Sequence, residues 1–284
     1  MTGPIGEPGV VAITGATGRL GRAALRAREG SWRALIRRGS VAPPGVEAVA
    51  GDLGDRDALA DLVRGADVVL HLATAMGSSD AGDMFEVNVA GTRRLLEAAG
   101  ERRVVFTSSV AARDPSLGAY AASKAQAERL VLEAGGVVLR LPVLYGVGTQ
   151  VEAAILGLGQ RLPLVPAIRG RDLRPLHLDD AAAACLAALS AGEGTYTLAG
   201  PEALSFPDFA RALLRASGSR SRALPLPAGP MIAAAGILER VWPGSPVSRE
   251  SLRAASAGTP PADRRAHTDL AFAPRGIAAG VAGR

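Results

Sequence analysis

A tyrosine and a lysine stand four residues apart in a segment that is typical of an α-helix. Tyr120 and Lys124 would lie on one face of the predicted helix Ala119–Ala134. A free tyrosine has a pKa of about 10, and a fixed ammonium beside it would lower that pKa by stabilising the phenolate. The pair is therefore suited to general acid/base catalysis. For the pentapeptide alone, the alternative is an amphipathic helix with an exposed lysine and a half-buried tyrosine.

The composition of the chain favours the catalytic interpretation of this pair. The sequence has 32 Lys and Arg residues, and Lys124 is the one lysine among them. An ammonium is compact and changes its pKa readily, whereas a guanidinium stays charged. The chain thus has lysine in place of arginine at the position where acid/base chemistry needs a basic group whose pKa can change.

Hydroxyl side chains end the predicted strand Arg103–Ser108. In Phe106-Thr-Ser-Ser109, the last serine would hold a substrate oxygen by a hydrogen bond while Tyr120 gives or takes its proton. The alternative for this segment is a serine-rich turn. A Ser-His-Asp triad is not indicated, because the three histidines have no nucleophile elbow to serve.

A glycine-rich loop follows the first predicted strand. Residues 14–21 are Thr-Gly-Ala-Thr-Gly-Arg-Leu-Gly, a G-x-x-G-x-x-G spacing that leads into a helix. Glycine lets backbone amides at the positive helix end approach a pyrophosphate, although an ordinary glycine-rich turn is the alternative. The loop residues predicted to bind the cofactor are Gly15, Thr17, Gly18, Arg19, Leu20 and Gly21.

Arginines stand where the second predicted strand ends. Enzymes that use NAD commonly have Asp or Glu there for the ribose hydroxyls, but this chain has Arg37 and Arg38. A guanidinium can clamp a 2′-phosphate, so we expect NADP, with Arg37 as the main ligand, Arg38 and Arg19 assisting, and NAD as the other option. The alternative is that these are solvated arginines.

The elements that must position these residues alternate between strands and helices. Their spacing predicts βαβ units and a doubly wound parallel α/β sheet. The predicted strands are Val10–Thr14, Trp32–Arg37, Val46–Ala50, Asp67–Leu72, Arg103–Ser108, Val137–Leu141 and Thr195–Leu198, and the predicted helices are Gly21–Glu29, Asp57–Arg64, Glu86–Ala99 and Ala119–Ala134.

Prolines and long connections break this alternation after Gly146. We expect a dinucleotide-binding domain over 1–145, a substrate-region insertion over 146–175, a return to the main domain over 176–200, and a small substrate-binding region over 201–284. The apolar, proline-rich stretch Leu224–Trp242 would help to wall the substrate pocket. Its alternatives are a helix packed on the sheet or a surface-seeking segment.

Composition excludes several other classes. The net charge is +5 and the basic residues are spread along the chain, so nucleic-acid binding is not indicated. Cys185 is the one cysteine, which rules out an internal disulfide and a cysteine-rich metal site. No signal peptide is expected from Met1–Gly9, and the uncharged apolar stretches are shorter than a membrane span of ~20 residues. We therefore expect a cytoplasmic protein without a metal.

Taken in order, these motifs resemble the short-chain dehydrogenases/reductases, in the extended or atypical branch that includes NAD(P)-dependent epimerases and dehydratases. The resemblance covers nearly the whole chain and implies a Rossmann fold. Besides the glycine loop and the Tyr/Lys pair, it is carried by Asp52-Leu53, His71-Leu72-Ala73, Asn88-Val-Ala-Gly-Thr92, Leu139 to Gly146, Leu176-His-Leu-Asp-Asp180 and Asp269 to Arg275.

The resemblance implies roles at the matching positions. Tyr120 would be the general acid/base, Lys124 would lower its pKa and hold the nicotinamide ribose, and Ser109 would orient the substrate oxygen. Asn88 would stand behind the lysine. Further cofactor contacts are implied for Asp52, Leu53, Leu72, Ala73, Thr74 and Pro142, as well as for Tyr120 and Lys124.

Two departures from the branch narrow the expected substrate. Val143 stands where sugar-nucleotide enzymes commonly have an asparagine for the diphosphate, and Val110-Ala111 stand where dehydratases have Asp-Glu. We therefore expect an NADP(H)-dependent oxidoreductase that interconverts a carbonyl and a secondary alcohol on a small, largely apolar molecule. The alternatives are an epimerase or lyase that uses the cofactor transiently, and a non-catalytic NADP(H)-sensing protein. Oligomeric state is left open, a homodimer being one option.

Overall fold

The computed structural model describes residues 8–76, 81–241 and 248–282. Most of the segment in which no signal peptide is expected, residues 1–7, lies outside the described residues. So does Trp242, the last residue of the apolar, proline-rich stretch.

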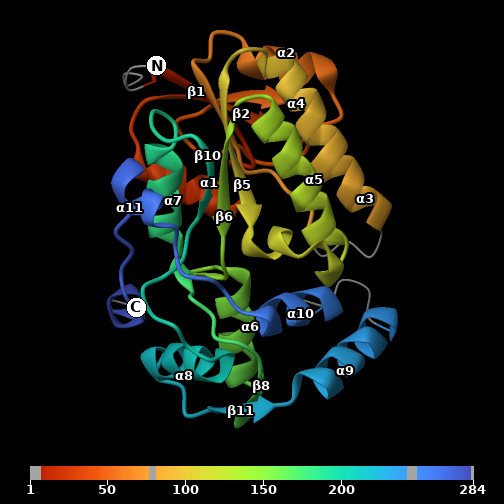
Figure 1. Ribbon diagram of the computed structural model, residues 1–284, viewed down its shortest axis with the longest axis vertical. Helices are drawn as coiled ribbons and strands as arrows, with labels where there is room; N and C mark the ends of the chain where they lie inside the picture. Colours follow the sequence, from red (N-terminus) through yellow and green to blue (C-terminus); the bar gives the residue numbers. More distant parts are fainter. Residues whose placement is uncertain (1–7, 77–80, 242–247, 283–284) are drawn as a thin grey trace.

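A sheet of seven parallel strands forms the centre of the protein (Figure 1). Its order, β10-β6-β5-β4-β1-β2-β3, reverses direction beside β1, as in a doubly wound fold. The strands are β1 Val10–Thr14, β2 Ser31–Ile36, β3 Glu47–Ala50, β4 Val68–His71, β5 Arg103–Ser109, β6 Val137–Leu141 and β10 Gly194–Thr197. All seven strands predicted from the sequence are therefore confirmed, with ends that differ by one residue or none.

Helices cover both faces of the sheet. On one face α1 Arg19–Ala27 and α7 Leu178–Ala187 pack over a core that includes Ile13, Leu70 and Leu139. On the other face lie α2 Arg56–Val63, α4 Gly91–Ala99 and α5 Ala119–Glu133. Burial on both faces explains why the strands read as continuous apolar runs.

The predicted helix Glu86–Ala99 is a composite. It begins as a π-helical turn, η1 Glu86–Ala90, which follows α3 Ala81–Phe85 and continues into α4. Two short 3-10 turns, η2 Val110–Arg113 and η3 Pro115–Leu117, join β5 to α5.

The C-terminal part builds a smaller layer at one end of the sheet, in the lower half of Figure 1. Its own core joins Tyr145, Val165, Phe209 and Leu213. Its elements are α6 Gln150–Gly159, α8 Phe206–Ala216, α9 Ala228–Val241, α10 Arg249–Ala257 and α12 Ile277–Val281, with β8 Leu164–Ile168 paired to β11 Arg222–Leu226 and β7 Leu144–Tyr145 paired to β9 Leu176–His177, both pairs parallel.

One segment within 201–284 returns to the main core. Helix α11 Arg264–Asp269 packs beside β10, and Ala266, Leu270 and Phe272 are buried with Tyr196. Within the stretch Leu224–Trp242, the described part forms the end of β11 and then α9, whose Ala235 packs on Ile168.

The described residues contain neither a membrane-spanning helix nor a cluster of metal-ligating side chains. None of their helices is long and apolar enough to cross a membrane. In the same ranges, no three His, Cys, Asp or Glu side chains gather as a metal site would require.

Candidate active site

The glycine loop is folded tightly against the end of β4. Gly15 has a positive φ of 76°, and a Cβ there would lie 2.7 Å from the backbone nitrogen of Ala73. Gly21 approaches the same loop, since a Cβ on it would lie 2.3 Å from the Gly15 carbonyl oxygen. Any side chain at either position would push the loop off the sheet, so both glycines are required by packing.

The start of the helix that follows this loop is suited to the phosphates of a dinucleotide. Helix α1 begins at Arg19, and its N-cap residue Gly18 has no side chain to satisfy the first amides. Thr17, Gly18 and Arg19 are partly or fully exposed at the carboxyl edge of the sheet. Uncapped amides at a helix N-terminus are suited to an anionic group, so these residues would hold the pyrophosphate.

The two arginines after β2 differ in their partners. Arg38 forms an ion pair with Asp55, at 3.5 Å between nitrogen and oxygen. Arg37 is exposed, and no carboxylate of the described residues is paired with it. Arg37 therefore has the freer guanidinium for a phosphate.

The segment after β3 lies beside this strand end. Gly51 donates to the Ile36 carbonyl at 2.9 Å, and Asp52 accepts from the backbone N–H of Gly54 at 2.8 Å. Leu53 is buried against Gly91, where a Cβ would lie 2.8 Å from that of Leu53. The predicted adenosine-binding residues are thus brought to the same edge as the glycine loop.

A buried chain of hydrogen bonds joins this loop to the helix behind it. His71 contacts Thr14 Oγ1 through Nδ1 at 2.7 Å and Thr92 Oγ1 through Nε2 at 2.9 Å. Thr92 donates to the Asn88 carbonyl, so its hydroxyl accepts from Nε2–H, and Nδ1 accepts from Thr14. Burial lowers the pKa of His71 to about 3, which keeps the ring neutral in this tautomer.

Asn88 lies in the π-helical turn, and all four hydrogen bonds of its amide are made. Its Oδ1 accepts from Thr74 Oγ1 at 3.1 Å and from the Ala75 N–H at 2.8 Å. Its Nδ2 donates to the Ala75 carbonyl and to Ser123 Oγ, each at 3.0 Å. Asn88 therefore fixes the segment after β4 to α5, and its contact on α5 is Ser123, the residue before Lys124.

Tyr120, Ser109 and Thr74 come together where α5 begins and where β5 and β4 end. The side chains of Ser109, at the end of β5, and Thr74, which follows β4, act on the Tyr120 hydroxyl and favour its phenolate. Burial raises the pKa of Tyr120 to about 12, against the opposing effect of the Ser109 and Thr74 side chains. The structure therefore brings together the proton donor and the oxygen-orienting group that the sequence predicts.

Lys124 is buried one helical turn from Tyr120. Its Nζ donates to the Thr107 carbonyl at 2.7 Å and lies 4.1 Å from the centroid of the Phe106 ring. Burial lowers its pKa to about 7, while the Glu128 carboxylate opposes this change. The Lys124 amine is directed to Thr107, and burial sets the direction of the Tyr120 pKa; the expected lowering of that pKa by Lys124 stays a prediction.

Glu250 is the site residue that sequence reasoning misses. Its Oε1 accepts from the backbone N–H of Tyr120 at 2.6 Å and of Ala121 at 3.2 Å. The one sequence signal is Gly118, which precedes the helix and has no side chain with which to cap it. A partner 130 residues away in the sequence could not be chosen from that signal.

The remaining predicted residues lie around this centre. Leu72 and Ala73 both donate backbone N–H groups to Thr14, beneath Gly15, and Pro142 is buried after β6. The Arg19 guanidinium faces the loop after β7, where a Cβ on Gly148 would lie 3.9 Å from its Nε. The cofactor and catalytic roles of these residues stay predictions.

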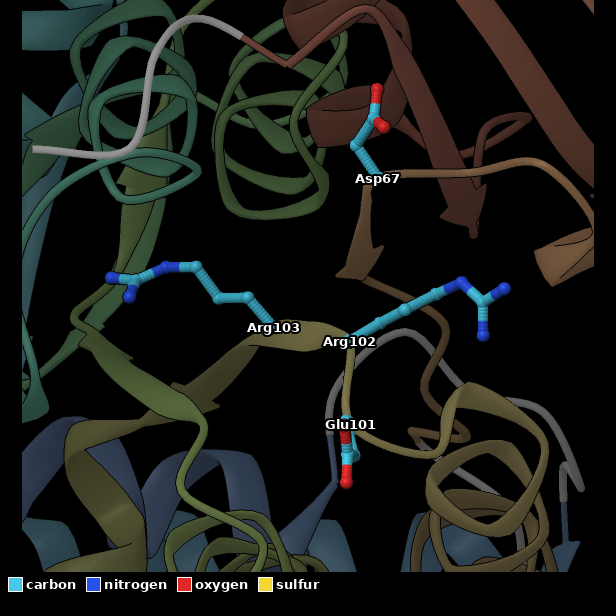
Figure 2. Close-up of a pocket in the computed structure, with 4 residues that line it drawn as sticks. All are labelled: Asp67, Glu101, Arg102 and Arg103. Atoms are coloured by element: carbon cyan, nitrogen blue, oxygen red, sulfur yellow. The ribbon is translucent and has the colours of Figure 1, made fainter. Parts of the chain in front are cut away.

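A separate open pocket of about 640 Å³ lies at the opposite edge of the sheet (Figure 2). Asp67, Glu101, Arg102 and Arg103 line it, where β4 and β5 begin. In Figure 2 these side chains point in different directions, and the Arg103 guanidinium donates to the carbonyl oxygens of Ala188, Ala191 and Gly192. This pocket therefore offers no convergent set of groups for a ligand.

Comparisons with known proteins agree with this geometry. The model of the NAD dependent epimerase/dehydratase family matches residues 11–199. The ketoreductase of Stigmatella aurantiaca named for 4-hydroxy-2-methyl-3-oxo-4-farnesyl-3,4-dihydroquinoline-1-oxide is 30% identical over 276 residues, which cover 81% of this chain and 80% of that protein. Ceramide reductase of Caulobacter vibrioides is 40% identical over 191 residues, 63% of this chain, and the alignment spans 60% of its length.

A solved structure shares the fold over nearly the whole chain. The Bordetella bronchiseptica enzyme WbmH, in complex with NAD⁺, has a TM-score of 0.75 with 16% identity, covering 97% of this chain and 96% of its own. This likeness concerns the fold, and the family model connects the fold to a nicotinamide nucleotide. The chain belongs to the NAD dependent epimerase/dehydratase family and is an NAD(P)-dependent oxidoreductase of Rossmann fold.

Proposed function

We propose that this enzyme uses NADPH and NADP⁺ to interconvert a carbonyl and a secondary alcohol on a small, largely apolar molecule. The observation that carries the proposal is the Tyr120 hydroxyl at the carboxyl edge of the sheet, where the side chains of Ser109 and Thr74 favour its phenolate. A phenol with two such partners is oriented for proton transfer to a bound oxygen.

The side chains divide the work at the reacting carbon. Ser109 orients the substrate oxygen, and Tyr120 donates a proton to it during reduction or accepts one during oxidation. Lys124 and the glycine loop hold the cofactor in place. When bound, the nicotinamide supplies or receives the hydride.

The choice of NADP over NAD rests on the end of β2. Arg37 is exposed and unpaired with any described carboxylate, and no acidic residue follows the strand to bind ribose hydroxyls. A guanidinium favours a 2′-phosphate through paired, charge-assisted hydrogen bonds. Arg38, already paired with Asp55, would assist.

Three observations support an apolar substrate. The C-terminal layer includes the apolar helix α9, of which the first ten residues carry no charge. Val143 stands where a diphosphate-binding asparagine is expected in sugar-nucleotide enzymes. The names of two relatives, ceramide reductase and the farnesyl-quinoline ketoreductase, describe reduction of largely apolar molecules.

The test is a titration of the purified protein with NADPH and NADH, followed by a panel of apolar ketones and aldehydes monitored at the nicotinamide absorbance. We expect tighter binding of NADPH, its consumption by an apolar carbonyl, and a loss of kcat of at least about 10²-fold in Tyr120→Phe with NADPH affinity retained. Tighter NADH binding would reject the role of Arg37. Full turnover by Tyr120→Phe would reject the proton donor.

The family also contains epimerases, and the same experiment distinguishes that activity. An epimerase retains its cofactor through purification and converts substrate without net loss of NADPH. Such a result would replace the proposed reductase while keeping the roles of Tyr120 and Lys124.

A further inference from the structure

One carboxylate of the C-terminal layer reaches the first turn of the catalytic helix. We infer that Glu250 is a positioning residue, which fixes Tyr120 to helix α10 and makes the acid/base group respond to the substrate-binding layer. The inference rests on the proposed function, in which Tyr120 exchanges a proton with substrate.

The contact replaces a cap that α5 lacks. The first amides of a helix have no partner within it, and the N-cap residue Gly118 offers no side chain. Glu250 Oε1 accepts from the N–H groups of Tyr120 and Ala121, at 2.6 and 3.2 Å. A Cβ on Gly118 would lie 2.5 Å from that oxygen, so glycine leaves the room that the carboxylate occupies.

The helix that carries Glu250 is tied to the rest of the C-terminal layer. Ser248 and Ser251 form a capping box at the start of α10, and Glu239 of α9 accepts from the Arg249 N–H at 2.8 Å. Leu252 packs in one cluster with Ile168 of β8 and Ala235 of α9. A shift of α9 and α10 around a substrate would therefore move the carboxylate that holds Tyr120.

Glu250 also acts on Tyr120 by its charge, since the carboxylate contributes to the raised pKa of the phenol. Other nearby charges are engaged elsewhere: Lys124 with Thr107, Glu128 with Arg140, and Glu86 with Arg94. The ionisable side chains on α5 and the elements that pack on it are Asp83, Glu86, Arg93, Arg94, Glu97, Arg103, Arg113, Asp114, Lys124, Glu128, Arg129, Glu133, Arg140, Arg249, Glu250 and Arg253.

Loss of the Glu250 charge would change the pH dependence of reduction and of oxidation in different ways. Removing the negative charge stabilises the phenolate and lowers the pKa of Tyr120. Reduction needs the neutral phenol, so its rate would begin to fall at a lower pH. Oxidation needs the phenolate, so its rate would begin to rise at a lower pH.

The experiment compares Glu250→Gln, which keeps a carbonyl acceptor and removes the charge, with wild-type enzyme. We expect the pH-rate limb assigned to Tyr120 to move to lower pH by roughly half a unit or more in both directions. The matched control is Glu202→Gln: Glu202 accepts from the Ile277 N–H at the start of α12, at 3.1 Å, and should leave the profile unchanged. Glu250→Ala, which removes the acceptor as well, should lower kcat about tenfold while NADPH affinity stays within about twofold.

A second readout does not depend on turnover. In the NADP⁺ complex, the tyrosinate absorbance of each protein minus that of its Tyr120→Phe counterpart reports the ionisation of Tyr120. If tyrosinate absorbance appears at a lower pH in Glu250→Gln than in wild type, the result supports the inference, whether or not any tested carbonyl is reduced. Failure to reduce every tested carbonyl would count against the proposed function and not against this inference. Superimposable onsets and pH-rate profiles for wild type, Glu250→Gln and Glu202→Gln would overturn it and leave Glu250 as a structural cap.

Discussion

Replacement of Lys124 by methionine is expected to stabilise the fold while it abolishes activity. The lysine is 2% exposed, and burial lowers its pKa from 10.5 to about 7. Between these two values the unfolded chain holds a proton that the folded chain has released. The free energy of unfolding of the wild type therefore rises with pH across this window, whereas an uncharged methionine contributes no such dependence.

The magnitude follows from the two pKa values of Lys124. At about 1.4 kcal/mol per pH unit, the buried amine destabilises the fold by about 5 kcal/mol well below pH 7 and by about 4 kcal/mol at pH 7. Methionine leaves the Thr107 carbonyl without the donor it has at 2.7 Å, a loss of about 1–3 kcal/mol. We expect the variant to be more stable than wild type by about 2 kcal/mol at pH 7. That advantage should fall by about 3 kcal/mol on raising the pH to about 9.5.

Urea unfolding at several pH values, followed by circular dichroism, measures this difference directly. Arg129→Met is the matched control, because Arg129 is exposed on the same helix and its removal should change stability by less than about 0.5 kcal/mol at every pH. A Lys124→Met protein less stable than wild type at pH 7, with a difference that does not change with pH, would refute the assignment of a buried, readily deprotonated amine.

Three further predictions concern the cofactor loop and the support of the lysine. Arg37→Ala should raise the Kd for NADPH about tenfold or more and leave that for NADH within about twofold, by nicotinamide fluorescence titration; equal losses would contradict a 2′-phosphate contact. Gly15→Ala should destabilise the protein by about 1–3 kcal/mol more than Gly45→Ala, because both have a positive φ but only Gly15 meets backbone atoms. Glu128→Gln should lower the free energy of unfolding by about 3 kcal/mol, since it leaves Arg140 without a full counter-charge, and a neutral result would show that this pair is dispensable.

The sequence was sufficient to predict the sheet and its functional edge. Apolar runs of four to six residues, separated by helical patterns, identify parallel strands, and parallel strands end at one edge. That rule alone brings Gly15, Ser109 and Arg37 to the same side of the sheet, as the structure has them. The local periodicity of apolar residues and the direction of each strand were enough to predict this edge, because both can be read from a few neighbouring residues.

What the sequence could not predict depends on burial and on distant partners. The pairing of Tyr120 with Lys124 suggests a lowered phenol pKa, yet the net direction is upward because desolvation outweighs nearby donors. The contact between Glu250 and Tyr120 could not be predicted either, because the two residues are 130 positions apart in the sequence. Spacing shows which groups share a helix face, but it does not show how much water each group loses.

The burial of Lys124 explains why the chain uses lysine here and arginine at every other basic position. Among the residues that the structure describes, the amine contacts one carbonyl oxygen, that of Thr107, and the face of the Phe106 ring. A guanidinium carries five N–H donors and cannot give up its charge, so most of its donors would be buried without partners. The ammonium can lose a proton when buried and regain it beside an anionic or hydroxyl-rich ligand. A buried position with this one acceptor therefore favours lysine on physical grounds, although the rest of the chain uses arginine. The buried amine lowers the stability of the fold, a cost that functional sites commonly carry.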